Sequence, residues 1–175
     1  MNELEQLTQR QRTVFDQDNM TAYAWRVRKY FVNCNTAIDI GCGIGYQTAE
    51  LSKLLPDVCF VMLDKSGNEN SVNYSEFGYA HNNLELTKKY AEKHINGSVY
   101  DVDEYNWSHS AQVVYSTLSW GWHYPVELYL DHVMQLAPRY IILDTRKNID
   151  IKNYKFVDSF RINRKENTVV FEKLQ

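Results

Sequence analysis

The sequence TAIDIGCGIGYQT, residues 36–48, places three glycines directly after a short apolar run that contains an aspartate. Residues 37–40 are typical of a short buried strand, and residues 46–55 are typical of the helix that follows it, which Pro56 ends. A plain strand-to-helix connection does not need so much glycine, because each one costs about 0.5–1 kcal/mol on ordering. The pattern therefore indicates that another group comes close to this backbone.

The composition limits what the chain can be. It has 175 residues, with 19 Lys/Arg, 22 Asp/Glu and a formal net charge of −3, and no block of like charge stands out. This balance argues against nucleic acid as the main partner. Because no internal repeat or linker-like stretch is visible, we expect one domain over residues 1–175, with helices in 1–35 and a ligand-binding sheet core in 36–175. The oligomeric state stays open.

The cysteines and histidines give no sign of a metal site. Cys34, Cys42 and Cys59 form no CxxC pair, and the five histidines never stand at a ligand spacing such as HxxxH. The N-terminus MNELEQLTQR is polar, and no apolar run approaches the roughly 18 residues of a membrane helix. We therefore expect a cytoplasmic protein with reduced thiols, no bound metal and no membrane segment.

Apolar strand patterns alternate with helical patterns along most of the chain. Besides 37–40, strands are expected at 58–64, 98–103, 112–119, 140–145, 155–163 and 168–174. Besides 46–55, helices are expected at 3–17, 21–31, 79–94 and 125–137, with a long polar loop at 65–78. This order predicts an α/β protein with a Rossmann-like, doubly wound and mostly parallel seven-stranded sheet, in which a C-terminal hairpin places an antiparallel strand.

Polar residues and glycine stand at or near the predicted carboxyl ends of the strands, where open parallel sheets bind their ligands. They are Asp39, Gly41, Asp64, Asp101 and Ser116. The glycines follow the pattern DxGxGxG, whereas a dinucleotide fingerprint reads GxGxxG, and position 46 is a tyrosine. A pyrophosphate would also fit poorly beside Asp39. The pattern therefore argues against a dinucleotide as the ligand.

The order of the acids indicates a nucleoside ligand with a positive centre. Gly41 and Gly43 let a ligand lie against bare backbone, and the next helix offers free N–H groups to a carboxylate. Asp64 ends the second strand, where a carboxylate can accept both hydroxyls of a ribose. Asp101 ends the third strand, where it can accept from the amino group of adenine. S-adenosylmethionine combines a carboxylate, a ribose, an adenine and a cationic centre.

At these residues the chain resembles the class I S-adenosylmethionine-dependent methyltransferases, over about residues 21–175. The resemblance is carried by IDIGCGIGYQT at 38–48, FVMLD at 60–64 and SVYDVD at 98–103. It implies S-adenosylmethionine as cofactor and S-adenosylhomocysteine as product. The cofactor-binding residues that it implies are Asp39, Gly41, Gly43, Gly45, Tyr46, Asp64, Asp101 and Ser116. Two alternatives stay open: Tyr46 can instead face the core, and Asp103 can take the role of Asp101.

A second resemblance concerns the methyl acceptor. YSTLSWGWHYPVELYLDHV at 115–133, followed by YIILDTRK at 140–147, looks like a group of bacterial and phage proteins described as sugar or small-molecule O-methyltransferases. It implies methyl transfer to a small hydroxylated acceptor, such as a sugar or a sugar-like metabolite. The chain has no inserted domain to cover that acceptor, so we expect the N-terminal helices and the 65–78 loop to do so.

The segment SWGWHYP at 119–125 follows the fourth predicted strand. Trp120, Trp122 and Tyr124 can form an apolar wall around the substrate and the sulfonium, including cation–π contact. His123, with an ordinary pKa near 6.5, can take the proton from an acceptor hydroxyl at neutral pH and is the predicted catalytic residue. In the alternative interpretation the tryptophans pack under the following helix, and His123 caps it or faces solvent.

Other classes of methyltransferase leave motifs that this chain lacks. There is no [DN]PP[YF] motif and no Pro-Cys pair, because the three prolines precede Asp57, Val126 and Arg139. DNA amino-methylating and cytosine-C5 enzymes are thereby excluded. An RNA or protein methyltransferase, for which RINRK at 161–165 is a weak hint, remains an alternative. A non-catalytic S-adenosylmethionine-binding protein is a further alternative.

Overall fold

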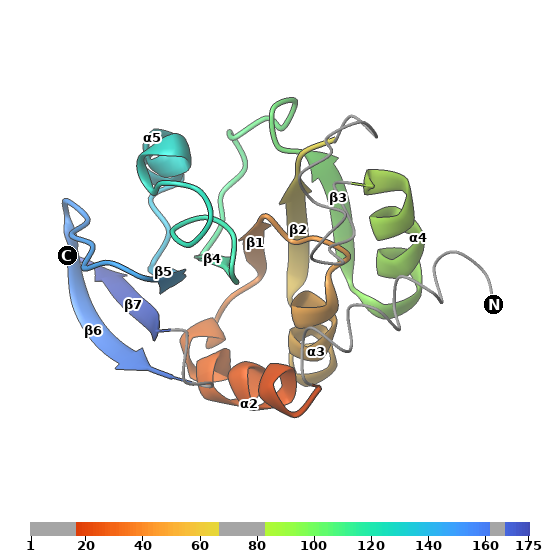
Figure 1. The fold of residues 1–175 in the computed structure, drawn as a ribbon, viewed down its shortest axis with the longest axis horizontal. Coiled ribbons are helices and arrows are strands. Elements are labelled where there is room, and N and C mark those ends of the chain that lie inside the picture. Colours follow the sequence, from red (N-terminus) through yellow and green to blue (C-terminus); the bar gives the residue numbers. More distant parts are fainter. Residues whose placement is uncertain (1–16, 67–82, 162–166) are drawn as a thin grey trace.

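The computed structural model describes residues 17–66, 83–161 and 167–175. In these ranges helices and strands alternate along the chain, as the sequence pattern predicts (Figure 1). The helices are α2 (Gln17–Val27), the 3₁₀ helix η1 (Arg28–Phe31), α3 (Tyr46–Leu54), α4 (Leu84–His94) and α5 (Glu127–Leu136). The strands are β1 (Thr36–Ile40), β2 (Cys59–Asp64), β3 (Gly97–Asp101), β4 (Val113–Ser116), β5 (Tyr140–Thr145), β6 (Tyr154–Phe160) and β7 (Asn167–Lys173).

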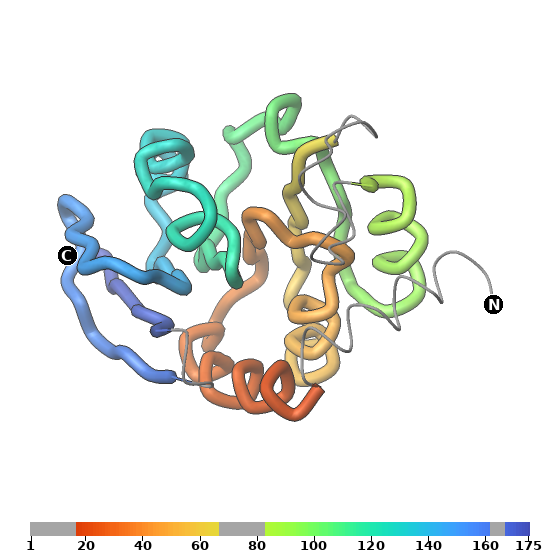
Figure 2. Tube along the Cα trace, in the orientation of Figure 1, coloured from red at the N-terminus to blue at the C-terminus, as the bar shows by residue number. Residues whose placement is uncertain are grey.

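The strands form one seven-stranded sheet in the order β3-β2-β1-β4-β5-β7-β6. Strands β1 to β5 pair in parallel, and β7 is antiparallel to both β5 and β6. The chain builds the sheet outward from β1 to β3 and then returns to β4 on the other side of β1, as the colours of Figure 2 trace. The predicted fold class is confirmed, and the point where the strand order reverses lies between β1 and β4.

Helices cover both faces of the sheet. Successive side chains of a strand point to opposite faces, so each buried strand contributes to a hydrophobic core on either side. In β1, Ala37 packs with α2, η1 and α3, whereas Ile38 and Ile40 pack with α5. Met62 of β2 and Val99 of β3 pack against α4 on the side of α2 and α3. The sheet is therefore doubly wound, as predicted.

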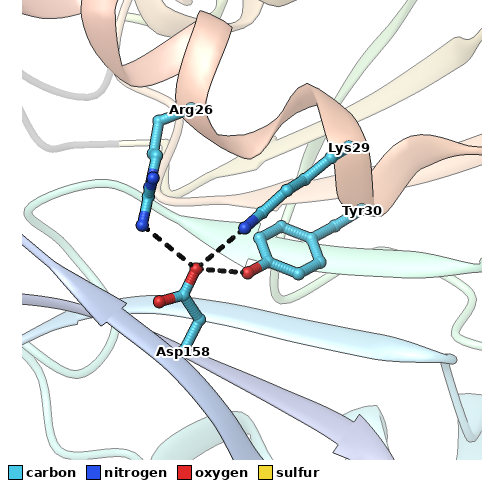
Figure 3. Close-up of polar contacts among 4 residues, drawn as sticks. All are labelled: Arg26, Lys29, Tyr30 and Asp158. Atoms are coloured by element: carbon cyan, nitrogen blue, oxygen red, sulfur yellow. Dashed lines mark hydrogen bonds and ion pairs between the residues drawn. The ribbon is translucent and has the colours of Figure 1, made fainter.

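Asp158 attaches the helical segment α2–η1 to the edge strand β6 (Figure 3). Its Oδ2 accepts from Tyr30 OH at 2.6 Å, from Lys29 Nζ at 3.0 Å and from Arg26 at 3.4 Å. Three donors on one carboxylate oxygen hold the pKa of Asp158 below its usual range, with the tyrosine hydrogen bond as the main cause. The contact joins segments about 130 residues apart in the chain and so holds α2 and η1 against β6.

Several predicted boundaries were wrong. The helix expected at 21–31 is already present at Gln17, the first described residue, and its last turn is the 3₁₀ helix η1. The strand expected at 112–119 stops at Ser116, because Leu118 has a φ of +58°, which a strand cannot contain. The strand expected at 98–103 stops at Asp101, where the chain turns and Glu104 N donates to the Asp101 carbonyl.

The helix expected at 79–94 begins within the described residues at Leu84. Asn83 precedes it as the N-cap, and its side chain accepts from Leu86 N at 3.2 Å. Residues 3–16 of the expected helix at 3–17, most of the expected 65–78 loop and the turn of the C-terminal hairpin lie outside the described residues. The expectation that the N-terminal helices and the 65–78 loop cover the substrate therefore stays a prediction.

Candidate functional site

The carboxyl ends of the parallel strands bring several predicted site residues to one edge of the sheet. Asp39 of β1 is in register with Tyr115 of β4, and Asp64 of β2 is in register with Asp101 of β3. The glycine loop at 41–45 leaves this edge from β1. The acids that the sequence placed at separate strand ends are therefore neighbours in space.

All three glycines of the loop have positive φ angles, at which side chains are strained: Gly41 +75°, Gly43 +56° and Gly45 +93°. A Cβ on Gly41 would overlap the side chain of Ser119, and a Cβ on Gly45 would overlap Met62. A Cβ on Gly43 would meet none of the described residues within 4 Å. Packing among the described residues thus explains two of the glycines, whereas it leaves the space beside the Gly43 backbone open to a ligand.

The carboxylate of Asp64 connects β2 to this loop. Its Oδ2 accepts from Gly43 N at 2.7 Å, and its Oδ1 accepts from Lys65 N at 2.8 Å. Burial raises the pKa of Asp64, the two backbone hydrogen bonds lower it, and Asp101 raises it, with a net increase. The backbone donors hold Asp64 beside the bare backbone of Gly43.

Asp101 is held by the segment after β2. Ser66 donates to its Oδ2 through both the backbone N, at 3.0 Å, and the hydroxyl, while Asp103 N donates to Oδ1 at 2.9 Å. Burial acts to raise the pKa of Asp101, but these hydrogen bonds bring it below its usual value. The exposed carboxylate of Asp103 pairs with Lys65 at 3.4 Å. Asp101 is the acid whose strand position is in register with Asp64, and its preference over Asp103 as the adenine acceptor stays a prediction.

Asp39 is 2% exposed and lies under the start of α3. Thr48 Oγ1 donates to its Oδ2 at 2.5 Å, and that hydroxyl is 2.9 Å from Tyr115 OH. Among the described residues, no hydrogen-bond donor reaches the other oxygen, Oδ1. Burial raises the pKa of Asp39 to about 7, against the effect of the Thr48 hydrogen bond, and the charge of Asp64 adds to the increase. A buried carboxyl oxygen without a donor is costly and is suited to receive one from a ligand.

Two predicted cofactor residues are engaged inside the protein. Tyr46 is buried at the start of α3 and packs edge-on against Tyr90 of α4, at 4.9 Å between ring centroids. The Ser116 hydroxyl donates to Ile40 O at 2.6 Å and accepts from Trp120 N at 2.9 Å. Tyr46 thus matches the alternative in which it faces the core, and Ser116 joins the end of β4 to β1 and to the following loop.

The aromatic residues of the loop after β4 occupy different environments. Trp120 is fully buried, and its indole Nε1 donates to Val126 O at 2.7 Å, so it packs under α5 as the alternative interpretation supposed. Trp122 is half-buried, and the Arg146 guanidinium lies 4.1 Å from its ring centroid. Tyr124 pairs with Trp120 in an isolated β-bridge.

His123 is exposed in this loop, and its backbone N donates to Ser119 O at 2.8 Å. Partial burial lowers the pKa of His123, and the positive charge of Arg146 lowers it further. The imidazole is therefore neutral at pH 7, the form that can accept a proton. Its role as catalytic base stays a prediction.

Thr48, Ser119 and Arg146 belong to this region but were not predicted from the sequence. Arg146 follows β5 directly, so the strand-end rule that selected Asp64 could have found it. Ser119 contacts Gly41 only because β4 lies next to β1. Thr48 reaches Asp39 because one turn of helix returns it to the strand end. The order of strands in the sheet, which sequence patterns do not give, determines the contact of Ser119 with Gly41.

Within residues 17–66, 83–161 and 167–175, no group of three or more His, Cys, Asp or Glu residues is arranged to hold a metal ion. In the same ranges, no helix has both the length and the apolar character needed to cross a membrane.

Neither a family model nor a curated protein sequence matches this chain. Solved structures do match. A variant of MtNAS in complex with S-adenosylmethionine superposes with a TM-score of 0.64 at 13% identity, over 94% of this chain and 65% of that one. The O-methyltransferase TomG from Streptomyces achromogenes, also in complex with S-adenosylmethionine, gives 0.59 at 11% identity, over 100% and 91%. The 16S rRNA methylase ArmA gives 0.58 at 12% identity, over 90% and 83%.

These matches establish the fold. The chain has the fold of the class I S-adenosylmethionine-dependent methyltransferases, as the sequence predicted. The chain spans only part of some of the matched proteins: 65% of the length of MtNAS and 57% of the length of TnmH. TnmH superposes with a TM-score of 0.55 at 11% identity over 88% of this chain. At such identities the substrate does not follow from the fold.

Proposed function

We propose that this chain is an S-adenosylmethionine-dependent methyltransferase that acts on a small hydroxylated acceptor, such as a sugar or a sugar-like metabolite. The observation that carries the proposal is the backbone of Gly43 beside the carboxylate of Asp64, at a strand end next to that of β1, which carries Asp39. The fold supports it, because TomG and MtNAS share the fold and their solved structures contain S-adenosylmethionine.

The residues of the site fit this cofactor. Asp39 Oδ1 has no donor among the described residues and suits the ammonium of the methionyl group. The α3 N-terminus, which follows Gly45, has free N–H groups for the methionyl carboxylate. Asp64 suits the ribose hydroxyls and Asp101 the adenine amino group, since both carboxylates lie at adjacent strand ends. The methionyl and adenosyl parts then extend from β1 towards β3.

The sulfonium of the cofactor supplies an activated methyl group, so the protein need not provide a metal or a covalent nucleophile. When the S–CH₃ bond breaks and the O–CH₃ bond forms, the acceptor hydroxyl loses its proton, and His123 is the residue that we assign to take it. Positioning of the two reactants contributes most, since aligned reactants gain effective molarities of about 10⁵–10⁸ M. A general base typically adds about 10²–10⁴-fold.

The alternative of an RNA substrate has weaker support. ArmA, which has the same fold, is by its description a 16S rRNA methylase. The net charge of −3, however, does not favour a polyanion. We therefore prefer the small acceptor.

Calorimetry with S-adenosylmethionine, S-adenosylhomocysteine and NAD tests the cofactor assignment. We expect binding of the first two and none of NAD, and binding of NAD alone would refute the proposal. Release of S-adenosylhomocysteine with a panel of hydroxylated acceptors then tests catalysis. If the protein binds the cofactor but methylates no acceptor in the panel, while RNA is methylated or is retained in a salt-dependent manner, the alternative replaces the small acceptor.

A further inference from the structure

The edge of the sheet that carries the candidate site is divided by charge. Its β1–β3 half carries Asp39, Asp64 and Asp101. Its β5 half carries Arg146 and Lys147, which follow the last residue of β5 directly. The one acid of β5 itself, Asp144, is buried and accepts hydrogen bonds from Leu118 N and the Thr168 hydroxyl. At about 4.8 Å between neighbouring strands, β5 lies roughly 10 Å across the sheet from β1. A ligand that spans this edge therefore meets acids at one end and cations at the other.

Arg146 is held in place by contacts on both sides. Its guanidinium lies over the ring of Trp122, at 4.1 Å from the centroid. The buried Thr145 hydroxyl donates to Lys147 O at 2.8 Å and accepts from Lys147 N at 3.1 Å, which closes a tight turn around Arg146. The stacking and the turn reduce the freedom that this side chain would lose on binding an anion.

Unlike Arg26 and Arg139, Arg146 has no carboxylate partner among the described residues. Arg28, which lies over the ring of Trp25 at 3.8 Å, has none there either, but it belongs to η1, which precedes β1, and not to a strand end. Arg26 lies over Phe160 and pairs with Asp158 at 3.4 Å. Arg139, at the opposite end of β5, lies over Tyr140 and has Glu172 at 3.9 Å. In residues 17–66, 83–161 and 167–175, no ion pair involves Arg146, so its donors remain for a ligand.

We propose that Arg146, stacked on Trp122, binds an anionic group of the methyl acceptor, a carboxylate or a phosphate. This inference rests on the proposed function and narrows it to a hydroxylated acceptor that also carries negative charge. The planar guanidinium presents paired N–H donors that match such oxyanions. Trp122 and His123 are adjacent in the chain, so an anion on Arg146 places the rest of the acceptor beside the proposed base.

The position of Arg146 assigns it to the acceptor rather than to the cofactor. The glycine loop and the acids that suit the cofactor lie on β1 to β3, and β4 separates them from β5. The positive charge of Arg146 helps to lower the pKa of His123. An anion bound to Arg146 would offset that charge, so the base would become stronger when the acceptor is present.

Three sugars that share hydroxyl groups and differ at one carbon provide the test: glucose, glucuronate and glucose 6-phosphate. Each is titrated against the full-length protein saturated with S-adenosylhomocysteine and carrying isotopically labelled tryptophan. The indole signal of Trp122, assigned with the Trp122→Phe variant, reports binding. The Arg146→Gln variant removes the charge. Arg139→Gln is the matched control, because it removes a stacked arginine at the other end of the same strand.

We expect at least one of the two anionic sugars to shift the Trp122 signal saturably and to bind at least about tenfold more tightly than glucose. The Arg146→Gln variant loses this preference, and Arg139→Gln keeps it. The tighter of the two anions identifies the preferred group. Equal binding of the three sugars, no binding of either anion, or an unchanged preference in Arg146→Gln would overturn the inference.

A failure of the proposed function can be distinguished from a failure of the anion subsite. If calorimetry detects no binding of S-adenosylhomocysteine to the wild-type protein, the function is wrong and the inference that rests on it falls too. If the cofactor binds and only uncharged acceptors are methylated, the function stands and the anion subsite is wrong.

Discussion

Gly43 and Asp64 are joined by a 2.7 Å hydrogen bond in which the backbone N–H of the glycine donates to a carboxylate oxygen. The bond connects the loop after β1 to the end of β2, so the bare backbone and the acid form one structural unit. A change to either residue should therefore alter both the loop and the cofactor affinity.

Replacing Asp64 should weaken cofactor binding. The Asp64→Ala variant leaves the ribose hydroxyls without a charged acceptor and removes the acceptor for Gly43 N, so we expect a loss of about 2–3 kcal/mol in S-adenosylmethionine affinity. Calorimetry measures it. Asp103→Ala is the control, because Asp103 is an exposed acid that pairs with Lys65. If both variants bind like wild type, Asp64 is not the ribose ligand.

Two glycines of the loop should respond differently to alanine. The new Cβ of Gly43→Ala meets none of the described residues, so we expect a loss of about 1 kcal/mol in folding stability from the positive φ, and a fall of about tenfold or more in cofactor affinity. Gly41→Ala overlaps Ser119 and should lower stability by about 2 kcal/mol or more. Thermal unfolding and calorimetry separate the two effects.

A second substitution checks the cause at Gly41. Ser119→Gly removes the side chain that the new Cβ would overlap, so the Gly41→Ala/Ser119→Gly variant should regain part of the lost stability. No recovery would show that the overlap is not the source of the loss. Normal cofactor affinity in Gly43→Ala would argue against a ligand at that backbone.

Asp39 should make stability depend on pH. Its folded pKa is about 7, above the ordinary value near 3.9. Its contribution is therefore fully present below about pH 4 and is lost as pH rises through 7, because the buried carboxyl must then ionise, at up to about 4 kcal/mol. The difference in Tm between Asp39→Asn and wild type should thus shift in favour of the variant from pH 4 to pH 8. A difference that stays constant would contradict the raised pKa.

The same substitution should reduce function. An ionised Asp39 suits the cofactor ammonium, so wild-type affinity should increase as pH rises through about 7, and Asp39→Asn should bind more weakly without that dependence. Thr48→Val is a useful comparison, since it removes the hydroxyl that donates to Asp39 but leaves the carboxyl in place. The protonated form of Asp39 therefore favours folding stability, whereas the ionised form favours cofactor binding.

The contact between Tyr30 and Asp158 should stabilise the fold. We expect Tyr30→Phe to lower the free energy of unfolding by about 1 kcal/mol at pH 7, because it loses the 2.6 Å hydrogen bond. Arg26 and Lys29 are half-exposed, so their ion pairs should contribute less. The pKa of Asp158 is lowered, so its contribution is present above about pH 4 and is lost as pH falls through the folded pKa.

Urea unfolding of wild type, Tyr30→Phe and the neighbouring control Ser159→Ala measures this contribution. At pH 7 the Tyr30→Phe variant should be the least stable of the three, and below the folded pKa of Asp158 its deficit should shrink. A deficit as large in acid as at pH 7 would mean that the tyrosine acts through packing rather than through the carboxylate.

The strands and the acids at their ends could be predicted because each depends on local pattern. Asp64 and Asp101 each follow an apolar run, and parallel strands bring such ends together. The end of β4 could not be predicted, because Leu118 adopts a positive φ that its residue type rarely takes. The burial of Trp120 likewise depends on a carbonyl of Val126 that faces its indole, which no sequence pattern gives.

His123 provides the last prediction, because it is the residue assigned to the proton transfer. His123→Ala should keep cofactor affinity within about twofold and lower kcat by about 10²-fold or more. Since burial and Arg146 lower its pKa, the acidic limb that the variant loses should lie below pH 6.5. His109→Ala is the control, since His109 stands before β4, at the opposite end of that strand. If His123→Ala keeps turnover with an unaltered pH profile, positioning of the reactants alone drives the reaction and His123 is not the base. If the variant loses cofactor binding, His123 supports the structure of the cofactor pocket and the assignment as base is wrong.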